Sequence, residues 1–434
     1  MIKIIKASEL KKDNLVQKTV SSSSVNTAVA MVIANILRRG DEALREYTER
    51  FDGCVPENFE LSRTAMDKAI KTVDPEFIKV MERAASNIEN FHRNQIQKGF
   101  DLPPKEGVIL GQRVNPIDRV GVYVPGGSAT YPSSVLMNCI PAKIAGVREI
   151  IIATPPSVEN MASESAANVN GVDARVLAAA KIAGVDRVFT MGGAQAIAAL
   201  AFGTETVPRV DKITGPGNAY VAEAKRQVFG IVGIDMIAGP SDVLIIADTT
   251  ANPELIAVDM ISQSEHGPDS PAIFVTNNKA LANKVSEEIE LLISKLPRKE
   301  IARKAIDECG KIIITKSIDD AFEISNLIAP EHLGIYLNEP FNYIDKVKNA
   351  GSVFLGKYTP VALGDYYAGP NHTLPTSGTS RFSSPLSVED FTKKTSYTYY
   401  SIEAVKAISE DVIRFADEEG LRAHALSVEK RIQK

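Results

Sequence analysis

Apolar and polar residues recur at helical spacing in the early part of the chain, from about Thr27 to Gln97. In VNTAVAMVIANILRRGDEALREYTERF and in PEFIKVMERAASNIENF, the apolar side chains return every three to four positions, which is the period of one helix face. We interpret His92, in the polar stretch NIENFHRNQIQKG, as part of a solvated helix surface. The pattern predicts a mainly helical region.

A different pattern follows, in which short apolar runs alternate with helical stretches. The segments VGVYVPGG, REIIIATPP and DRVFTMGG are typical of strands that end at Gly or Pro, and ARVLAAAKIAG and AQAIAALAF are typical of helices. Gly184 stands where a glycine would end the first of these helices. This alternation predicts an α/β unit with a mainly parallel sheet.

A second alternating region predicts another α/β unit. Its expected strands are DVLIIAD, PAIFVTN, KIIITKS and HLGIYLN, and its expected helices include NPELIAVDMISQSEH and ANKVSEEIELLISKL. The tail from Val388 onward is predicted to be mostly helical and amphipathic. Between the two regions, the Ser- and Asn-rich stretch Ser157 to Gly171 is interpreted as an inserted surface loop or a marginal helix.

Composition narrows the class of protein. The 434 residues suggest two or three domains, and 44% hydrophobic with 24% charged residues is ordinary for a globular chain. A net charge of -5 argues against nucleic acid as a partner. No signal-peptide core and no long apolar run occurs, so no membrane association is expected. Cys54, Cys139 and Cys309 form no CxxC, which favours a reducing, cytoplasmic setting.

Glycine pairs mark two expected strand–helix turns. Gly126-Gly127 and Gly192-Gly193 each follow a strand and precede a helix, a position where backbone N–H groups can face a phosphate. The alternative is that these glycines only make tight turns. No GxGxxG is present, since the nearest stretch, Gly215 to Tyr220, lacks the third glycine.

Four of the five histidines lie in the second half of the chain, each beside a carboxylate or an amide. The pairs are Gln263 with His266, Glu331 with His332, Asp365 with His372, and Glu419 with His424. Each pair taken alone is also explained as an ordinary loop or helix-end residue pair. Their joint occurrence indicates a metal-dependent enzyme whose chemistry lies between Gln263 and His424.

The residue types suggest particular roles. Gln263 and His266, at i and i+3 near a helix end, would share one face and could hold a divalent cation. Glu331 and His332 suit general acid–base work near neutral pH. Asp365 offers a hard oxygen ligand from a Gly- and Pro-rich loop.

In these residues the chain resembles the histidinol dehydrogenase family, and the resemblance covers nearly the whole chain. Its most specific stretches are VGVYVPGGSATYPSSVLM, GGAQAIAALAFGTETVPRVDKITGPGNAYVAEAKRQV, IDMIAGPSDVLIIAD, SQSEHGPDS, APEHLG, AGSVFLGKYTP and ALGDYYAGPNHTLPTSGTSRFSSPLSVEDF. The resemblance implies oxidation of L-histidinol through an aldehyde to L-histidine, with two NAD and one zinc ion per active site.

The resemblance also implies a role for each site residue. The zinc ligands would be Gln263, His266, Asp365 and His424, and the acid–base pair would be Glu331 and His332. The expected substrate contacts are Ser241, His372 and Glu419 together with the zinc ligands and His332. Tyr123, Gln195 and Asn218 would contact NAD. Manganese or cobalt could also occupy such a mixed nitrogen and oxygen site.

The fold that the resemblance implies is α/β, with two incomplete Rossmann-like domains in an aldehyde-dehydrogenase-like architecture. Small helical segments would stand at both ends. The expected parts are an N-terminal segment (1–26), a discontinuous domain (27–115 and 244–385), an NAD-contacting domain (116–243), and a C-terminal helical segment (386–434). The family's homodimer would share its active sites, with Glu419 and His424 acting across the interface.

Three alternatives remain open at this point. A zinc hydrolase would use the same His, Asp and Glu side chains to activate water. A non-catalytic, metal-binding descendant would keep the fold without the reaction. A thiol-based aldehyde oxidation would need Cys139, but this residue lies in the apolar stretch MNCIPAKIAG and is expected to pack in the core.

Overall fold

The structure, a computed structural model, describes residues 1–10, 23–126, 130–159, 168–169 and 171–433. The chain divides into two compact units. The first comprises Met1–Gln95 with Asp118–Phe391, and the second comprises Ile96–Ile117 with Thr392–Lys434. Most of the predicted insertion lies outside the described residues, so its interpretation as a loop or a marginal helix is left open.

A six-stranded parallel sheet forms one half of the first unit. Its order is β1 (Lys3–Lys6), β13 (Lys311–Ile314), β12 (Ala272–Thr276), β11 (Val243–Ala247), β14 (His332–Tyr336) and β15 (Ser352–Leu355). Every neighbouring pair is parallel. The four strands expected from the second alternating region are therefore confirmed.

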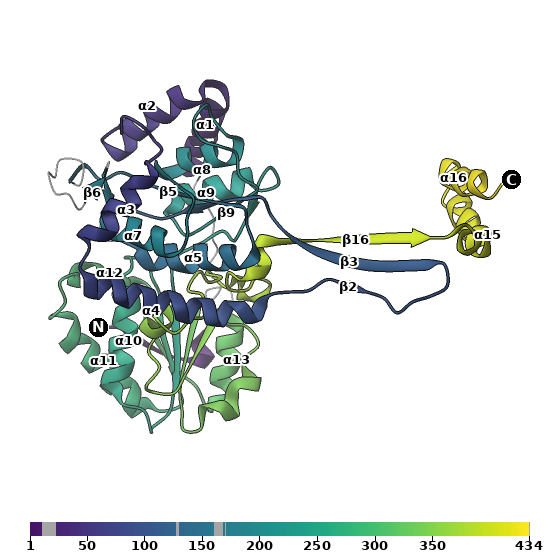
Figure 1. Ribbon diagram of the computed structural model, residues 1–434. Coiled ribbons are helices and arrows are strands. Elements are labelled where there is room, and N and C mark those ends of the chain that lie inside the picture. The colour runs from purple at the N-terminus through teal and green to yellow at the C-terminus, as the bar shows by residue number, and fades with distance from the viewer. Residues whose placement is uncertain (11–22, 127–129, 160–167, 170, 434) are drawn as a thin grey trace. The chain divides into compact units, whose positions relative to one another are not determined.

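Helices cover both faces of this sheet, and the strand residues alternate between two apolar cores. Val243 and Ile245 pack with α10 (Pro253–Ser264), α11 (Lys279–Ile293) and α12 (Lys299–Glu308). Leu244 and Ile246 pack with α13 (Ile318–Ile328) on the opposite face, as Figure 1 shows. Burial on both faces explains why these strands read as unbroken apolar runs.

A five-stranded parallel sheet forms the other half of the first unit. Its order is β10 (Gly233–Ile234), β9 (Lys212–Thr214), β4 (Arg119–Tyr123), β5 (Glu149–Thr154) and β8 (Arg187–Thr190). One face packs on α1 (Ser23–Arg39), α2 (Asp41–Asp52), α8 (Gly193–Phe202) and α9 (Ala219–Val228). The other face contacts α5 (Pro132–Ala145), where Cys139 is fully buried, as expected.

The helical region predicted from Thr27 to Gln97 is confirmed as α1, α2, α3 (Arg63–Thr72) and α4 (Pro75–His92). The interpretation of His92 as a solvated residue is wrong, because its side chain is fully buried. Its Nδ1 atom contacts Gln95 Oε1 at 2.6 Å, and its Nε2 atom contacts Asn371 at 3.4 Å. His92 continues the buried stripe of Met81, Ala84 and Ile88 along α4.

The remaining short elements complete the first unit. They are β6 (Asn168–Val169), β7 (Val172–Asp173), α7 (Ala174–Ile182) and α14 (Val361–Tyr366), together with short 3-10 helices. Gly184 has φ +71 directly after the end of α7, so its predicted role in ending this helix is confirmed.

The second unit corrects the prediction of a mostly helical tail from Val388. The tail contains the nine-residue strand β16 (Thr392–Tyr400) before α15 (Ile402–Glu418) and α16 (Arg422–Ile432). Figure 1 shows β16 beside β3 (Val108–Pro116), with which it pairs antiparallel along its whole length. The short strand β2 (Phe100–Asp101) pairs with the other edge of β3.

The predicted N-terminal helical segment also needs correction. Residues Lys3–Lys6 form β1, an edge strand of the six-stranded sheet, and only Ala7–Glu9 make a 3-10 turn. The four-part domain boundaries remain a prediction. Among the described residues, no helix is both long enough and apolar enough to cross a lipid bilayer.

Candidate active site

The candidate site begins where two central strands of the six-stranded sheet start. Ser241 and Asp242 directly precede β11, Glu331 directly precedes β14, and His332 is the first residue of β14. In the parallel register Val243 pairs with His332, so these four residues lie together at the amino ends of the strands. Since α10 returns from the carboxyl end of β11 to the amino end of β12, its last turn faces the same edge.

A reciprocal set of hydrogen bonds joins Asp242 to Glu331. The backbone N–H of Asp242 donates to Glu331 Oε2 at 2.9 Å, and the backbone N–H of Glu331 donates to Asp242 Oδ1 at 2.9 Å. The Ser241 hydroxyl also donates to Glu331 Oε2. Burial raises the pKa of Glu331 to about 8 despite these donors, so this carboxyl can take up and release a proton near neutral pH.

The imidazole of His332 is held in one tautomer. Its Nδ1 atom lies 2.9 Å from the carbonyl oxygen of Asp242, which can only accept, so Nδ1 carries the proton. The other ring nitrogen, Nε2, is buried and has no hydrogen-bond partner among the described residues. It lies 3.8 Å from Asp365 Oδ1. The arrangement leaves Nε2 available as a base.

The backbone is strained two residues before the Glu331–His332 pair. Ala329, which follows the end of α13, has φ +56, a left-handed conformation that a residue with a Cβ adopts at a cost. It is fully buried, and its carbonyl accepts a hydrogen bond from the Ser380 hydroxyl. The sharp turn at Ala329 directs Pro330 and Glu331 back to the sheet edge.

The expected loop position is wrong for Asp365, which lies in the short helix α14, whereas His372 does lie in the loop that follows this helix. His372 Nδ1 donates to the backbone carbonyl of Asp365 at 2.9 Å, and its Nε2 lies 3.4 Å from the Ser134 hydroxyl. Burial lowers the pKa of His372, which favours the neutral ring. Both ring nitrogens therefore have partners within the protein.

Gln263 and His266 lie at the end of α10. The Gln263 side chain is 1% exposed, and its Nε2 atom has no partner among the described residues. A flip of the amide would place its oxygen, a metal-ligand atom, in that position. The His266 residue is exposed to solvent, yet surrounding protein lowers its pKa while the Asp365 carboxylate acts in the opposite direction.

These donors fit a divalent cation only in part. An unpartnered buried amide, an imidazole and a carboxylate make a mixed nitrogen and oxygen set suited to zinc. No group of three or more His, Cys, Asp or Glu side chains in the described part of the chain could hold a metal ion. The first unit thus offers fewer ligands than a four-coordinate zinc site needs.

The other two predicted site residues belong to the second unit. Glu419 follows the last residue of α15, and His424 lies in the first turn of α16. Gly420, with φ +73, separates the two helices. Both side chains line a shallow hollow between α15 and α16.

The three residues expected to contact NAD line one cleft of about 820 Å³ in the first unit. Tyr123 ends β4, Gln195 lies in the first turn of α8, and Asn218 caps α9 by accepting from the backbone N–H groups of Tyr220 and Val221. All three therefore come from the carboxyl-end side of the five-stranded sheet, where nucleotides bind in open α/β folds. Asp52, at the end of α2, lines the same cleft.

The turn at Gly192-Gly193 does not offer free N–H groups to a phosphate. The N–H of Gly193 donates to the Tyr123 hydroxyl at 3.0 Å, and the N–H of Gly192 donates to the Asp52 carboxylate. A Cβ on Gly192 would lie 2.5 Å from Pro155. Close backbone packing therefore explains this pair, as the alternative interpretation had it, and Gly127 lies outside the described residues.

The stretch from Gly215 to Asn218 is fixed by a buried ion pair. Lys225 is 1% exposed and donates both to Asp235 and to the carbonyl of Gly215 at 2.9 Å. Asp235 in turn accepts from the N–H of Gly215 at 2.8 Å. A Cβ on Gly215 would lie 2.1 Å from the carbonyl oxygen of Tyr123, so only glycine fits there.

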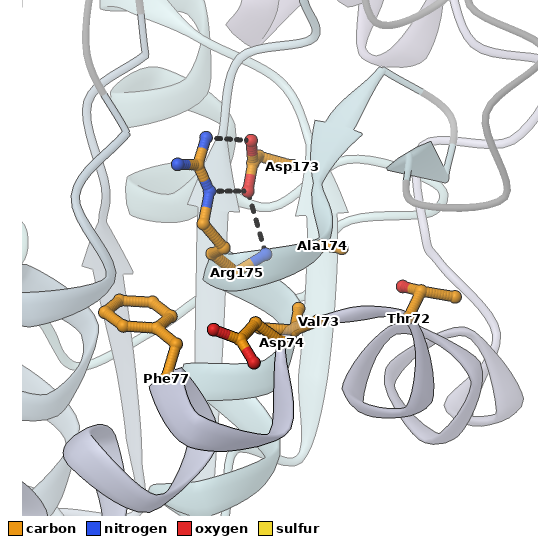
Figure 2. Close-up of a pocket in the computed structure, with 7 residues that line it drawn as sticks. All are labelled: Thr72, Val73, Asp74, Phe77, Asp173, Ala174 and Arg175. Carbon is orange, nitrogen blue, oxygen red and sulfur yellow. Dashed lines mark hydrogen bonds and ion pairs between the residues drawn. The ribbon is translucent and has the colours of Figure 1, made fainter.

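Figure 2 shows a separate hollow of about 550 Å³ that carries no such chemistry. It lies between the turn that joins α3 to α4 and the start of α7. Asp173 caps α7, and both of its oxygens accept from the Arg175 guanidinium at 2.9 and 2.7 Å. Asp173 and Arg175 therefore satisfy each other, and Asp74 is used to cap α4 by accepting from the backbone N–H of Glu76.

Asp242 and Asp52 are the site residues that sequence reasoning missed. Neither lies in a motif with recognisable ligand spacing. Asp242 reaches Glu331 only through the pairing of two strands that are distant in the chain. The position of Asp242 directly before an apolar run of strand type was the one available signal.

Three comparisons with known proteins each find a match that covers almost the whole chain. The profile of the family described as "Histidinol dehydrogenase" matches residues 15–432. A histidinol dehydrogenase from Streptococcus mutans is 50% identical over 426 residues, covering 98% of this chain and 95% of that protein. One from Clostridium acetobutylicum is 49% identical over 412 residues, covering 95% and 93%. The crystal structure of histidinol dehydrogenase from Elizabethkingia anophelis matches with a TM-score of 0.90 at 38% identity, covering 99% and 98%.

Proposed function

The chain belongs to the histidinol dehydrogenase family of NAD-dependent dehydrogenases, and we propose that it oxidises L-histidinol through L-histidinal to L-histidine. The reaction uses two NAD and one zinc ion per active site and completes L-histidine biosynthesis in the cytoplasm. The observation that carries this proposal is the buried Glu331–His332 pair, which has a free ring nitrogen and a carboxyl that titrates near neutral pH.

Gln263, His266, Asp365 and His424 would hold the zinc ion. The unpartnered amide of Gln263 and the closeness of Asp365 to His332 support this set within the first unit. Zinc, when bound there, supplies a Lewis-acidic anchor that orients the amine and the imidazole of the substrate. His424 would be the fourth ligand, which explains why the first unit is short of one.

His332 would act as the base of the first oxidation. Its Nε2 lone pair accepts the hydroxyl proton of L-histidinol, while hydride leaves the carbon that bears this hydroxyl for the first NAD. The carbonyl of Asp242 holds the Nδ1–H, so the ring keeps the required tautomer and stabilises the imidazolium that forms. One NADH and L-histidinal result.

Glu331 would act in the second oxidation. As a carboxylate it accepts a proton from the water that adds to the aldehyde, and the hydrate then passes hydride to the second NAD. The raised pKa of Glu331 suits this role, because a carboxylate of higher pKa is a stronger base. Ser241, His372 and Glu419 would contact the substrate and limit its movement.

The cleft lined by Tyr123, Gln195 and Asn218 would bind NAD. Its volume of about 820 Å³ falls in the range of small-molecule sites. Since the N–H groups of Gly192 and Gly193 are already engaged, the cofactor would be held mainly by side chains and by contact with the proline-rich walls.

We further propose a homodimer in which Glu419 and His424 of one chain complete the site of its partner. Support comes from the small second unit, where Val412 and Phe415 on α15 and Leu421, directly before α16, are exposed apolar residues. Exposed apolar groups of this kind favour burial in an interface.

The decisive experiment mixes purified, zinc-loaded protein with L-histidinol and NAD and records absorbance at the NADH band. Two NADH for each L-histidinol, lost with a strong chelator and regained with zinc, are expected. Folded, dimeric, zinc-loaded protein that forms no NADH would overturn the proposal. Activity against an ester or amide without NAD would instead favour the zinc hydrolase, which leaves the Tyr123 cleft without a use.

A further inference from the structure

We propose that Asp242 is a positioning residue for both members of the Glu331–His332 pair, an inference that rests on the function proposed above. It is the last residue before β11, and the parallel register of β11 with β14 sets it opposite Glu331. No predicted site residue makes the same contacts as Asp242. The side chain, the backbone N–H and the backbone carbonyl of Asp242 each contact Glu331 or His332.

The contacts with Glu331 fix the carboxyl group and its own backbone together. The backbone N–H of Asp242 donates to Glu331 Oε2 at 2.9 Å, and Asp242 Oδ1 accepts from the Glu331 N–H at 2.9 Å. This reciprocity resembles the capping box of a helix, in which each residue binds the backbone of the other. The Glu331 carboxyl therefore cannot turn without breaking the link to Asp242.

The contacts with His332 fix the orientation of the ring. The carbonyl of Asp242 accepts from His332 Nδ1 at 2.9 Å and from its backbone N–H at 3.3 Å. Any shift of Asp242 would therefore move the imidazole and the carboxylate together. One residue thus couples the base of the first oxidation to the base of the second.

The surroundings of Asp242 argue for function rather than stability. Its residue exposure is 7%, and no cation pairs with it among the described residues. The groups that face Asp242 are Glu331, His332 and the N–H of Ser377. Burial, and then the charge of Glu331, raise the pKa of Asp242 to about 7. Two adjacent buried carboxyls are costly, and such pairs concentrate at active sites.

The closeness of the two buried carboxyls, Asp242 and Glu331, has a measurable consequence for the pKa of Glu331. The groups that face its carboxyl are Ser241, Asp242, His332 and Asp365. An ionised Asp242 opposes the ionisation of Glu331, because two like charges repel in a buried site. Removal of the Asp242 charge should therefore let Glu331 ionise at a lower pH.

The test compares the wild-type holoenzyme with Asp242→Asn by carboxyl ¹³C NMR titration of Glu331, assigned with Glu331→Gln. We expect the Glu331 midpoint to fall by about half a pH unit or more. The pH profile for kcat with L-histidinal should shift in the same direction, while KM for NAD stays constant. Asp242→Ala, which also removes the oxygen that accepts from the Glu331 N–H, should in addition lower kcat with L-histidinal below that of Asp242→Asn. An unchanged midpoint and profile in folded Asp242→Asn, together with equal kcat for the two variants, would overturn the inference.

Asp259→Asn is the matched control. Asp259 is also 7% exposed and lies in the same unit, but it accepts from the Tyr336 hydroxyl instead. This variant should not move the Glu331 midpoint. If Asp242→Asn does not fold, the shorter Asp242→Ser removes the same charge. Because the NMR titration needs no turnover, absence of NADH from the wild type would refute only the proposed function.

Discussion

Glu331 and His332 are neighbours in the chain, yet different partners hold their reactive atoms. The carboxylate of Glu331 accepts from Ser241 and Asp242, whereas the ring of His332 is held by a backbone carbonyl. A backbone carbonyl cannot be lost by substitution, so the tautomer of His332 is robust. One of the two donors to Glu331, the Ser241 hydroxyl, is a side chain, so the position of Glu331 is more easily perturbed by substitution.

Glu331→Gln should therefore separate the two oxidations. His332 keeps its tautomer and its free Nε2, so the first NADH should still form, but no carboxylate is left to activate water for the second. We expect the yield to fall from two NADH toward one, with L-histidinal trapped by an added amine reagent. Asp259→Asn serves as control and should still give two. Retention of two NADH by Glu331→Gln would remove Glu331 from the second step.

Asp52 gives a prediction about stability and pH. Burial raises its pKa to about 6 from an ordinary 3.8, so the folded state binds this proton more tightly than the unfolded state. Ionisation of Asp52 therefore destabilises the fold, with the penalty absent below about pH 4 and complete above about pH 6. We expect Asp52→Asn to raise Tm relative to the wild type more at pH 8 than at pH 5.

Thermal unfolding at the two pH values checks this expectation. The exposed Glu57→Gln should show no such pH-dependent difference. An equal change in Tm at both pH values for Asp52→Asn would show that the Asp52 charge does not destabilise the folded state.

The limits of sequence reasoning at this scale have identifiable physical causes. His92 was misread because its polar neighbours in sequence obscured its place on the buried stripe of Met81, Ala84 and Ile88, where helical spacing would have put it. Asp242 left no such trace. It acquires its partners only when β11 and β14 pair, and nothing local in the chain records that pairing.

At the scale of elements, the loop from Gly215 to Asn218 shows how a buried charge pair shapes the cleft lined by Tyr123, Gln195 and Asn218. Lys225 on α9 and Asp235 together satisfy both backbone groups of Gly215. This network sets the start of α9, and with it the position of Asn218.

Lys225→Met should destabilise the protein strongly, because it leaves the Asp235 carboxylate buried without its partner. The expected loss is about 3–5 kcal/mol in the free energy of unfolding, measured by urea titration. The double variant Lys225→Met with Asp235→Asn should recover part of the loss, since the unpaired charge is gone. If Lys225→Met lowers the free energy of unfolding by less than about 1 kcal/mol, this buried ion pair contributes no more than a surface ion pair does.

Strands buried on both faces were predictable, and exposed strands were not. β11 reads as VLIIA, with every residue buried, so its apolar run stands out from the surrounding sequence. β16 reads as TKKTSYTYY and is largely exposed, so it shows no such run. Its Thr and Tyr content was the missed signal, because β-branched and aromatic residues favour strands. The strand β1 was missed because its four residues are too few to show a period.

At the scale of the whole molecule, the division into two units determines how the site can be assembled. The first unit holds Gln263, His266, Asp365 and the acid–base pair, whereas Glu419 and His424 belong to the second. Under the proposed dimer, each complete site takes its first five residues from one chain and its last two from the partner.

Two inactive variants should then complement each other. Mixed dimers of His332→Asn and His424→Asn would contain one intact site and one doubly altered site, so random mixing should restore about a quarter of wild-type activity. The control pairs His332→Asn with Asp365→Asn, which alter the same unit and cannot form a site intact in both residues. Absence of restored activity, with mixed dimers demonstrated by native mass spectrometry, would count against a shared site.

The pairing of β1 with β13 also constrains how this chain is made. Lys3–Lys6 emerge early from the ribosome, yet their partner strand, Lys311–Ile314, is synthesised about 300 residues later. At translation rates of about 5–20 residues per second, the early strand waits for tens of seconds without its neighbour. The edge strand β1 can therefore join the sheet only after β13 has been made, and the six-stranded sheet is complete only when β14 and β15 follow.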